Sequence, residues 1–275
     1  MALKPYASLL EKVWYYVIRG FCVLVLLCLV LPILAIIPIS FTSDTMMSYP
    51  MPSLSLRWYH EFFNSVMWTL SMKNSFIIAF ATMALATALG TMSALGLTMS
   101  NFPFKGVVTG MMIMPIVVPI VISAVGIYFF FSWVGLTGTY LGMILAHTAL
   151  ATPFVVITVT ATLKGFNRNQ ARAGKSLGAS PLKVFFLVTL PQILPGVISG
   201  ALFAFVTSFD EVVVALFIAG SEQYTLPRQM FAGIREKYNP TIAAVATMMI
   251  VVSIMLMVTM ELLRRRNERL RGIKQ

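Results

Sequence analysis

Residues 193–219, ILPGVISGALFAFVTSFDEVVVALFIA, form an apolar run that contains two adjacent acids, Asp210 and Glu211. A helix rising about 1.5 Å per residue needs roughly 20 residues to cross a bilayer core, so the run can span a membrane. A charged side chain near the bilayer centre costs roughly 2.5–3.5 kcal/mol on insertion scales. We therefore expect the two acids to face a cavity or a partner group.

The rest of the chain has the same character. Hydrophobic residues make up 59% of 275 and charged residues 11%, and the mean hydropathy is +0.88, which excludes an ordinary soluble domain. The runs are continuous rather than alternating, so they favour helices over the strands of a barrel. We predict an all-α membrane protein with six transmembrane helices. The other five runs are residues 20–41, 76–99, 106–131, 139–163 and 241–263.

Two prolines, Pro115 and Pro119, fall inside the third run and predict a bend or break there. The sequence shows no repeat and no flexible linker. We expect one membrane domain over residues 20–263, preceded by a cytoplasmic segment over residues 1–19 and followed by a basic cytoplasmic tail over residues 264–275.

The basic residues indicate the orientation. All but five of the 20 lysines and arginines lie in the segments 1–19, 100–105, 164–183 and 264–275. The positive-inside rule places these segments, and both termini, in the cytoplasm. The net charge of +11 is thus a topology signal, and its division among four short segments argues against a nucleic-acid partner.

The longest expected cytoplasmic excursion, residues 164–195, has strong local structure signals. Residues 167–177 are suited to a short helix, and Gly178 supplies a turn. Ser180 is placed to cap a second helix that Pro181 opens. The excursion is therefore expected to be a structured helical hairpin rather than a linker.

The first of these helices carries an apolar patch. Ala173 and Leu177 are four residues apart, so they share a helix face and form a small knob among arginine and lysine. Such a knob suits docking into another protein. The prolines at 191 and 195 are expected to mark the entry to the fifth span.

A phosphate-binding motif is only mimicked here. Gly174-Lys175-Ser176 matches the end of a P-loop, but Asn169 stands where that loop needs glycine, and a helix is expected in place of the loop. We expect no cofactor to be bound by this chain, and no metal site.

The same excursion resembles a known family. KSLGASPLK at residues 175–183, with VTLP at 188–191, is similar to the "EAA" loop of membrane permeases in binding-protein-dependent ABC importers. Other short matches resemble the second permease of the spermidine/putrescine branch. They are residues 56–59, 74–75, 208–211, 225–227, 239–240 and 246–247.

The resemblance implies a type I ABC importer permease fold in the bacterial cytoplasmic (inner) membrane, surrounded by lipid. It implies a second related permease, two ATPase subunits that carry ATP and Mg, and an external substrate-binding protein. It also implies that residues 164–191 hold a coupling helix docked on the ATPase. The residues implied in that contact are Arg172, Ala173, Gly174, Leu177, Gly178, Ala179, Ser180 and Pro181.

This chain departs from the family pattern at two of those positions. Arg172 replaces an expected acidic residue, and Gly174 replaces an expected alanine. The first change reverses a charge at the presumed ATPase contact but leaves the apolar knob intact.

Asp210 and Glu211 fit the transport of an organic cation, most simply a polyamine. On one continuous helix the two acids would point about 100° apart. Asp210 would share its side with Phe203, Thr207, Val214 and Phe217, a carboxylate with aromatics that suits an ammonium group. Glu211 would face the partner permease. The alternative is structural, with one or both acids paired to a basic or backbone group.

Other interpretations stay open at this point. His147, the only histidine in a predicted span, either lies on the pathway or is a packed, hydrogen-bonded residue. A secondary transporter or channel would explain the acids but not the structured loop. An enzyme is disfavoured because no metal-binding or nucleophilic motif is present. Within the importer class, an opine, an aminophosphonate or ferric iron are alternative substrates, and the permease pair is homodimeric or heterodimeric.

Overall fold

The computed structural model describes most of the chain, and within the described part the regular elements are all helices. The described residues are 8–47, 49–236 and 239–270, without the side chains of 236, 260 and 263–270. Residues 1–7 and 271–275, which belong to the expected terminal segments, therefore lie outside the described residues.

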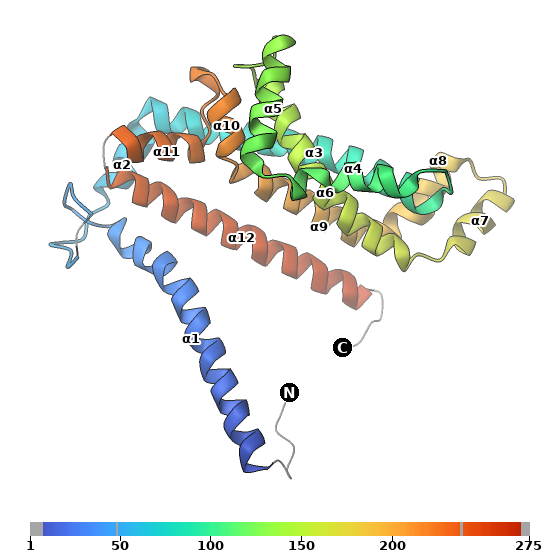
Figure 1. Ribbon diagram of the computed structural model, residues 1–275, viewed down its shortest axis with the longest axis horizontal. Coiled ribbons are helices and arrows are strands. Elements are labelled where there is room, and N and C mark those ends of the chain that lie inside the picture. Colours follow the sequence, from blue (N-terminus) through green and yellow to red (C-terminus); the bar gives the residue numbers. More distant parts are fainter. Residues whose placement is uncertain (1–7, 48, 237–238, 271–275) are drawn as a thin grey trace. The chain divides into compact units, whose positions relative to one another are not determined.

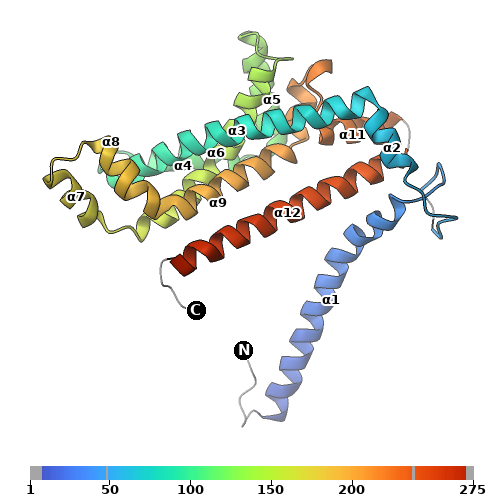
Figure 2. The same cartoon turned by 180° about the vertical axis from the view of Figure 1, so that it is seen from behind.

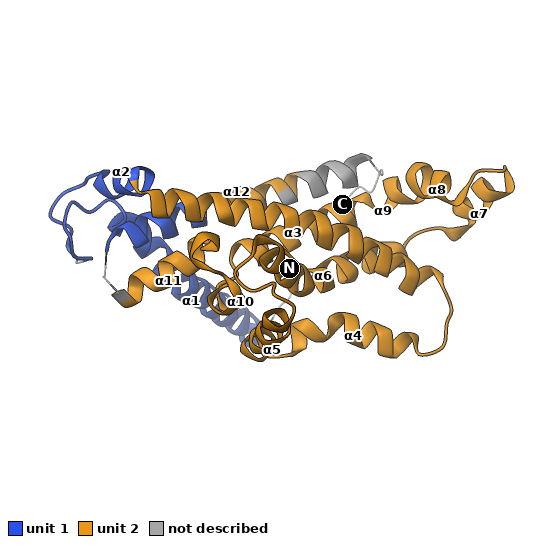
Figure 3. Ribbon diagram, turned by 90° about the horizontal axis from the view of Figure 1, so that it is seen from above, with its two compact units in different colours: residues 1–64, 237–249 blue, residues 65–236, 250–275 orange. Residues whose placement is uncertain are grey.

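The chain divides into two compact units (Figure 3). One consists of residues 1–64 and 237–249, and the other of residues 65–236 and 250–275. In the described part, five helices are long and apolar enough to cross a membrane, and a bent helix pair makes six if the pair is counted as one span. The predicted all-α membrane architecture is thus confirmed.

The smaller unit contains α1 (Leu9–Ile39), α2 (Arg57–Asn64) and the first part of α12 (Thr241–Leu270). Ser8 and Glu11 form a capping box at the start of α1, so this helix begins well before residue 20. The Glu61 carboxylate accepts hydrogen bonds from Asn239 Nδ2 at 3.0 Å and Thr241 Oγ1 at 3.2 Å. These bonds tie α2 to the beginning of α12.

The core of the larger unit is a bundle of α3 (Val66–Met99), α6 (Tyr140–Lys164) and α9 (Leu190–Phe209), which lie side by side in Figures 1 and 2. Glycines permit the close approach. A Cβ added at Gly90 would lie 2.6 Å from Val155 Cβ, and one at Gly196 would lie 2.1 Å from Thr162 Oγ1. Small residues at helix contacts are how membrane helices gain packing contacts without a hydrophobic driving force.

The third span is broken, as its prolines predict. α4 (Lys105–Val117) and α5 (Ile120–Trp133) meet at a bend of 105°. Pro119 precedes the first residue of α5, whereas Pro115 lies within α4. The break therefore occurs at Pro119, where the backbone after Val118 has no N–H to continue the α4 hydrogen bonds.

The fifth span differs from its prediction at both ends. It begins at Pro181 with α8 (Pro181–Val184) and passes through the π-helical turn η1 (Phe185–Thr189) into α9. Pro191 is accommodated because the Leu190 N–H bonds to the Phe185 carbonyl, which widens the helix where a proline would otherwise clash. At the other end, the helix stops at Phe209 instead of continuing to residue 219.

Three short helices complete the end of the larger unit that follows α9. They are α10 (Val213–Ile218), the 3₁₀ turn η2 (Ser221–Gln223) and α11 (Leu226–Glu236). Gln229 of α11 bonds to Met67 near the start of α3, whereas Arg168 bonds to the Thr98 carbonyl near its end. The short helix α7 (Arg168–Ser176) and α11 therefore lie at opposite ends of the bundle (Figure 1).

Candidate functional site

The predicted helical hairpin is present at one end of the bundle. Asn167 caps α7 by accepting the Asn169 N–H at 3.0 Å, and Gly178 has φ +82°. Ser180 caps α8 by accepting the Lys183 N–H at 3.4 Å, and Pro181 is its first residue. The predicted helix, turn and second cap are confirmed.

The tip of this hairpin presents the apolar side chains to solvent. Leu177 is 88% exposed, and Ala173 is exposed beside it on the last turn of α7. The turn is held by its own backbone, because the Ala179 N–H bonds to the Gly174 carbonyl at 3.2 Å and the Gly178 N–H bonds to the Lys175 carbonyl at 3.0 Å. An exposed leucine on a hydrogen-bonded turn is suited to a docking contact.

The two departures from the family pattern have different surroundings. A Cβ at Gly174 would lie 3.3 Å from Val184 Cγ2, so the glycine lets α7 pack closely on α8. Arg172 is exposed and, with Arg168 and Lys175, lines a shallow cavity of about 160 Å³. The surface next to the knob is therefore strongly basic.

The acidic pair lies at the other end of the bundle, in a break between two helices. α9 ends at Phe209 and α10 begins at Val213, so Asp210 to Val212 (the acidic break) is non-helical. The expectation of one continuous helix through both acids is wrong. Helical spacing therefore does not relate Asp210 to Val214 and Phe217.

The break gives the two acids different environments. Glu211 is 8% exposed, and its Oε1 accepts the Val214 N–H at 2.9 Å, which satisfies a free donor at the start of α10. Asp210 is exposed, and the structure gives its carboxylate no hydrogen bond within the described residues. Glu211 is thus paired with a backbone group, as the structural alternative for the acids expected. Asp210 is free to contact a ligand.

The residues expected around Asp210 differ in exposure, and Val214 and Phe217 lie beyond the acidic break. Phe203 and Phe217 are about two-fifths exposed, at 42% and 40%, whereas Val214 is fully buried. Thr207 is half-buried one turn before Asp210. Phe203 stacks against Phe154 of α6, with ring centroids 6.4 Å apart.

A different aromatic cluster leads to the acidic break. Phe209 lies 5.2 Å from Phe76 and 5.5 Å from Phe205 between ring centroids, and Phe205 lies 4.9 Å from Phe80. Phe80 is 52% exposed, while Phe205 and Phe209 are buried. The cluster joins α3 to α9 and fixes the position from which Asp210 emerges.

The outer segment (residues 220–236) is held on the bundle by a buried asparagine. Asn74 Nδ2 donates to the carbonyls of Glu222 at 2.8 Å and Tyr224 at 3.0 Å, and Asn74 Oδ1 accepts the Tyr140 hydroxyl at 2.8 Å. Beside it, Ser75 Oγ accepts the Leu226 N–H at 2.7 Å. Two polar side chains of α3 thus pair with the backbone of this segment, and the bond to the Leu226 N–H is buried.

Arg228 also holds the outer segment in place. Its guanidinium donates to the carbonyls of Ala219 and Gly220 and lies 3.8 Å from the centre of the Tyr224 ring. Burial lowers the pKa of Arg228 from its ordinary value. Arg228 therefore holds the turn after α10 in place through its hydrogen bonds to the Ala219 and Gly220 carbonyls.

His147 is a packed residue. It is 1% exposed, and its Nδ1 is 2.8 Å from Ser208 Oγ on α9, just before the acidic break. Its Nε2 has no hydrogen-bond partner in the described structure. Within the same part of the chain, no three His, Cys, Asp or Glu side chains are grouped as metal ligands would be.

The sequence did not predict which residues Asn74, Tyr140 and Ser208 contact. An asparagine inside an apolar span is a usable signal, because a buried amide needs partners. The identity of those partners cannot be predicted in the same way, because Asn74 and the Glu222 carbonyl are 148 residues apart in the sequence.

Comparison with known proteins gives consistent matches. The family model described as "Binding-protein-dependent transport system inner membrane component" matches residues 86–269. The spermidine/putrescine transport system permease protein PotC of Haemophilus influenzae is 32% identical over 253 residues, covering 92% of this chain and 98% of that protein. The putrescine transport system permease protein PotI of Escherichia coli is 33% identical over 227 residues, covering 80% of each.

A solved structure matches the fold. It is a chain of a bacterial ABC transporter involved in the import of the acidic polysaccharide alginate, with a TM-score of 0.73 over 94% of this chain and 99% of that one. At 14% identity, this likeness speaks for the fold alone.

Proposed function

This chain belongs to the family of inner membrane components of binding-protein-dependent transport systems, and from that premise we propose that it is the second permease subunit of an ATP-driven polyamine importer. The main support is the similarity to PotC along nearly the whole of both chains. The chain is a multi-pass inner membrane protein. We also propose that both termini and the coupling loop lie on the cytoplasmic side of the membrane.

ATP hydrolysis is assigned to separate subunits, and the coupling loop is their contact. In support, Leu177 projects from a turn braced by its own backbone, so a movement of the ATPase can be transmitted as a rigid-body shift of the bundle. The basic cavity beside it, with Arg172, suits an acidic patch on the ATPase. ATP binding must favour one conformation of the permease differentially for this contact to perform work.

Asp210 is proposed to contact the cationic solute, with Glu211 in a positioning role. The support is their difference in surroundings, because Glu211 is engaged with the α10 backbone and Asp210 is exposed and unpaired within the described residues. An exposed, unpaired carboxylate suits an ammonium group, which it can bind by a charge-assisted hydrogen bond. The second permease and the external binding protein would enclose the remaining sides of the path.

Uptake by the reconstituted transporter tests the proposal. Proteoliposomes holding this chain, its partner permease and ATPase should accumulate labelled putrescine or spermidine only with internal ATP and external binding protein. Omitting the ATPase should abolish accumulation. Uptake by this chain alone would instead establish a secondary transporter, and ATP-dependent uptake of another solute would retain the importer class while rejecting the substrate.

A further inference from the structure

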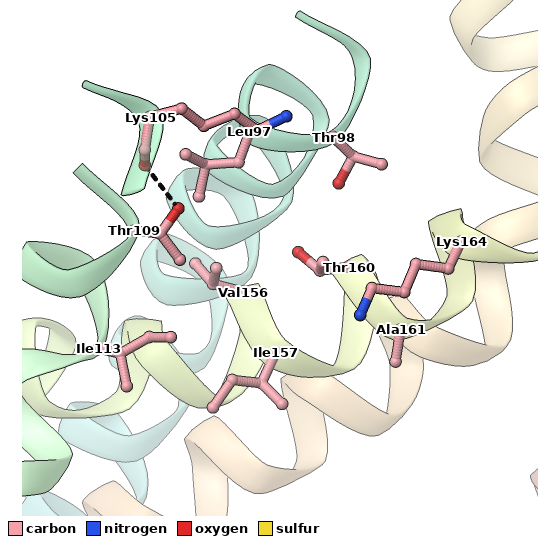
Figure 4. Close-up of a pocket in the computed structure, with 10 residues that line it drawn as sticks. All are labelled: Leu97, Thr98, Lys105, Thr109, Ile113, Val156, Ile157, Thr160, Ala161 and Lys164. Carbon is pink, nitrogen blue, oxygen red and sulfur yellow. Dashed lines mark hydrogen bonds between the residues drawn. The ribbon is translucent and has the colours of Figure 1, made fainter. Parts of the chain in front are cut away.

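A cavity of about 500 Å³ opens between α3, α4 and α6, at the end of the bundle where Arg168 meets Thr98. This volume is in the range of small-molecule sites. The lining is apolar on one side and basic at the other (Figure 4). It consists of Leu97, Thr98, Lys105, Thr109, Ile113, Val156, Ile157, Thr160, Ala161 and Lys164.

The basic side of this cavity has unused hydrogen-bond donors. The hydroxyls of Thr98 and Thr160 are buried and have no partner in the described structure. Lys164 Nζ likewise has none there, and Lys105 Nζ donates a single bond to the Ser100 carbonyl at 3.2 Å. In the view of Figure 4 the hydroxyls of Thr98 and Thr160 lie between the ammonium groups of Lys105 and Lys164.

We propose that this cavity binds the phosphodiester headgroup of an anionic phospholipid. Ammonium and hydroxyl groups donate hydrogen bonds, and a phosphodiester offers only acceptors and a negative charge. The same two lysines would repel a cationic solute, so the cavity is not a polyamine subsite. Basic pockets between membrane helices on the cytoplasmic side are suited to acidic headgroups.

The apolar side of the cavity favours a lipid over a free phosphate. Ile113, Val156 and Ile157 line it with hydrocarbon, which an acyl chain or glycerol backbone can cover and an inorganic ion cannot. No described residue of α4 is buried, so this helix stands at the margin of the bundle. The bound lipid would therefore fill the space between α4 and α6.

Binding of labelled phosphatidylglycerol to the detergent-purified, assembled transporter tests this site. Lys105→Gln with Lys164→Gln should weaken binding about 25-fold, at about fivefold for each lysine. The matched control is Lys175→Gln with Lys183→Gln, which removes the same charge from the coupling loop and should change binding less than twofold. Equal binding by the Lys105/Lys164 variant and the wild type would overturn the proposal.

A second variant keeps the charges and removes only the donors. Thr98→Val with Thr160→Val preserves side-chain shape, and we expect binding to weaken about tenfold through the lost hydrogen bonds. Phosphatidylcholine should bind far more weakly than phosphatidylglycerol. Displacement of the lipid by millimolar inorganic phosphate would identify a free-anion site and reject the lipid.

A cross-linker distinguishes lipid from protein as the occupant. With p-benzoylphenylalanine in place of Ile113, illumination of the assembled transporter in phosphatidylglycerol vesicles should yield an adduct with lipid. An adduct with the second permease would show that a protein helix covers the cavity and would overturn the proposal.

Discussion

The two ends of the larger unit are built in opposite ways. At the coupling loop, the caps and the turn join residues two to five positions apart, as in the Asn167 and Ser180 caps. At the outer segment, the bonds of Asn74 and Ser75 join residues 148 to 151 positions apart. The first end is a projection whose turn and caps are held by local bonds, and Arg168 links it to the Thr98 carbonyl of α3. The second end is bonded directly to α3, so a change in the packing of the bundle should alter this end as well.

This difference determines what substitutions at each end should do. At the coupling loop, changes should leave the bundle intact and uncouple it from its partner. At the other end, changes should alter solute contact or loosen the outer segment. Variants at each end therefore test whether the division is real.

The largest effect is expected from Gly178→Asp in the coupling loop. Gly178 has φ +82°, a conformation that costs other residues roughly 1–2 kcal/mol, and the new charge would lie beside the apolar tip. We expect transport-coupled ATP hydrolysis to be abolished while the protein remains inserted. ATPase activity of proteoliposomes with and without binding protein measures this.

Two further variants separate backbone from charge at this turn. Gly165→Asp places the same side chain in the same loop at φ −88° and should retain most of the coupling. Gly178→Asn, which tolerates the left-handed region, should recover more activity than Gly178→Asp. Full coupling in Gly178→Asp would contradict the docking role of the turn.

Truncation of the knob should have the next largest effect. Leu177→Ala removes most of an exposed side chain whose burial on docking is worth roughly 1.5–3 kcal/mol, so association with the ATPase should weaken about tenfold or more. Co-purification at graded ATPase concentrations measures this. Leu182→Ala, at 70% exposure on α8, is the matched control, and an equal loss there would mean that no specific knob exists.

The two acids at the break should respond differently. Asp210→Asn should lower polyamine uptake about tenfold, because an amide replaces the charge that would meet the ammonium group. Glu211→Gln should change uptake less than twofold, since the amide oxygen still accepts the Val214 N–H. Initial uptake rates at matched expression measure this. Unchanged uptake in Asp210→Asn would remove it from the pathway.

Local chemistry explains what could be predicted from the sequence. The Gly178 turn, the Ser180 cap and the Pro119 break follow from residues whose conformational preferences act within a few positions. The apolar runs likewise predicted the spans, because length and composition alone decide whether a helix can cross a membrane.

Non-local chemistry explains what could not be predicted. Nothing in the apolar run from Phe203 to Phe217 marks a helix end at Phe209, because the break depends on Glu211 turning back to the Val214 N–H. The fit of Gly196 against Thr162 depends on which helices become neighbours. Periodicity within one segment carries no information on either.

The smallest effect is expected where a single hydroxyl is removed from the network that pins the outer segment. Tyr140→Phe deletes the hydrogen bonds to Asn74 Oδ1 at 2.8 Å and to the Glu222 carbonyl at 3.2 Å, but leaves the bonds from Asn74 Nδ2. We expect a loss of about 1–2 kcal/mol in the local stability of this segment. Hydrogen exchange of residues 220–226 should then quicken roughly tenfold, with exchange at the coupling loop unchanged. Tyr128→Phe, a partly exposed tyrosine of α5, is the control. Faster exchange at both ends of the bundle would mean that the two ends are not independent.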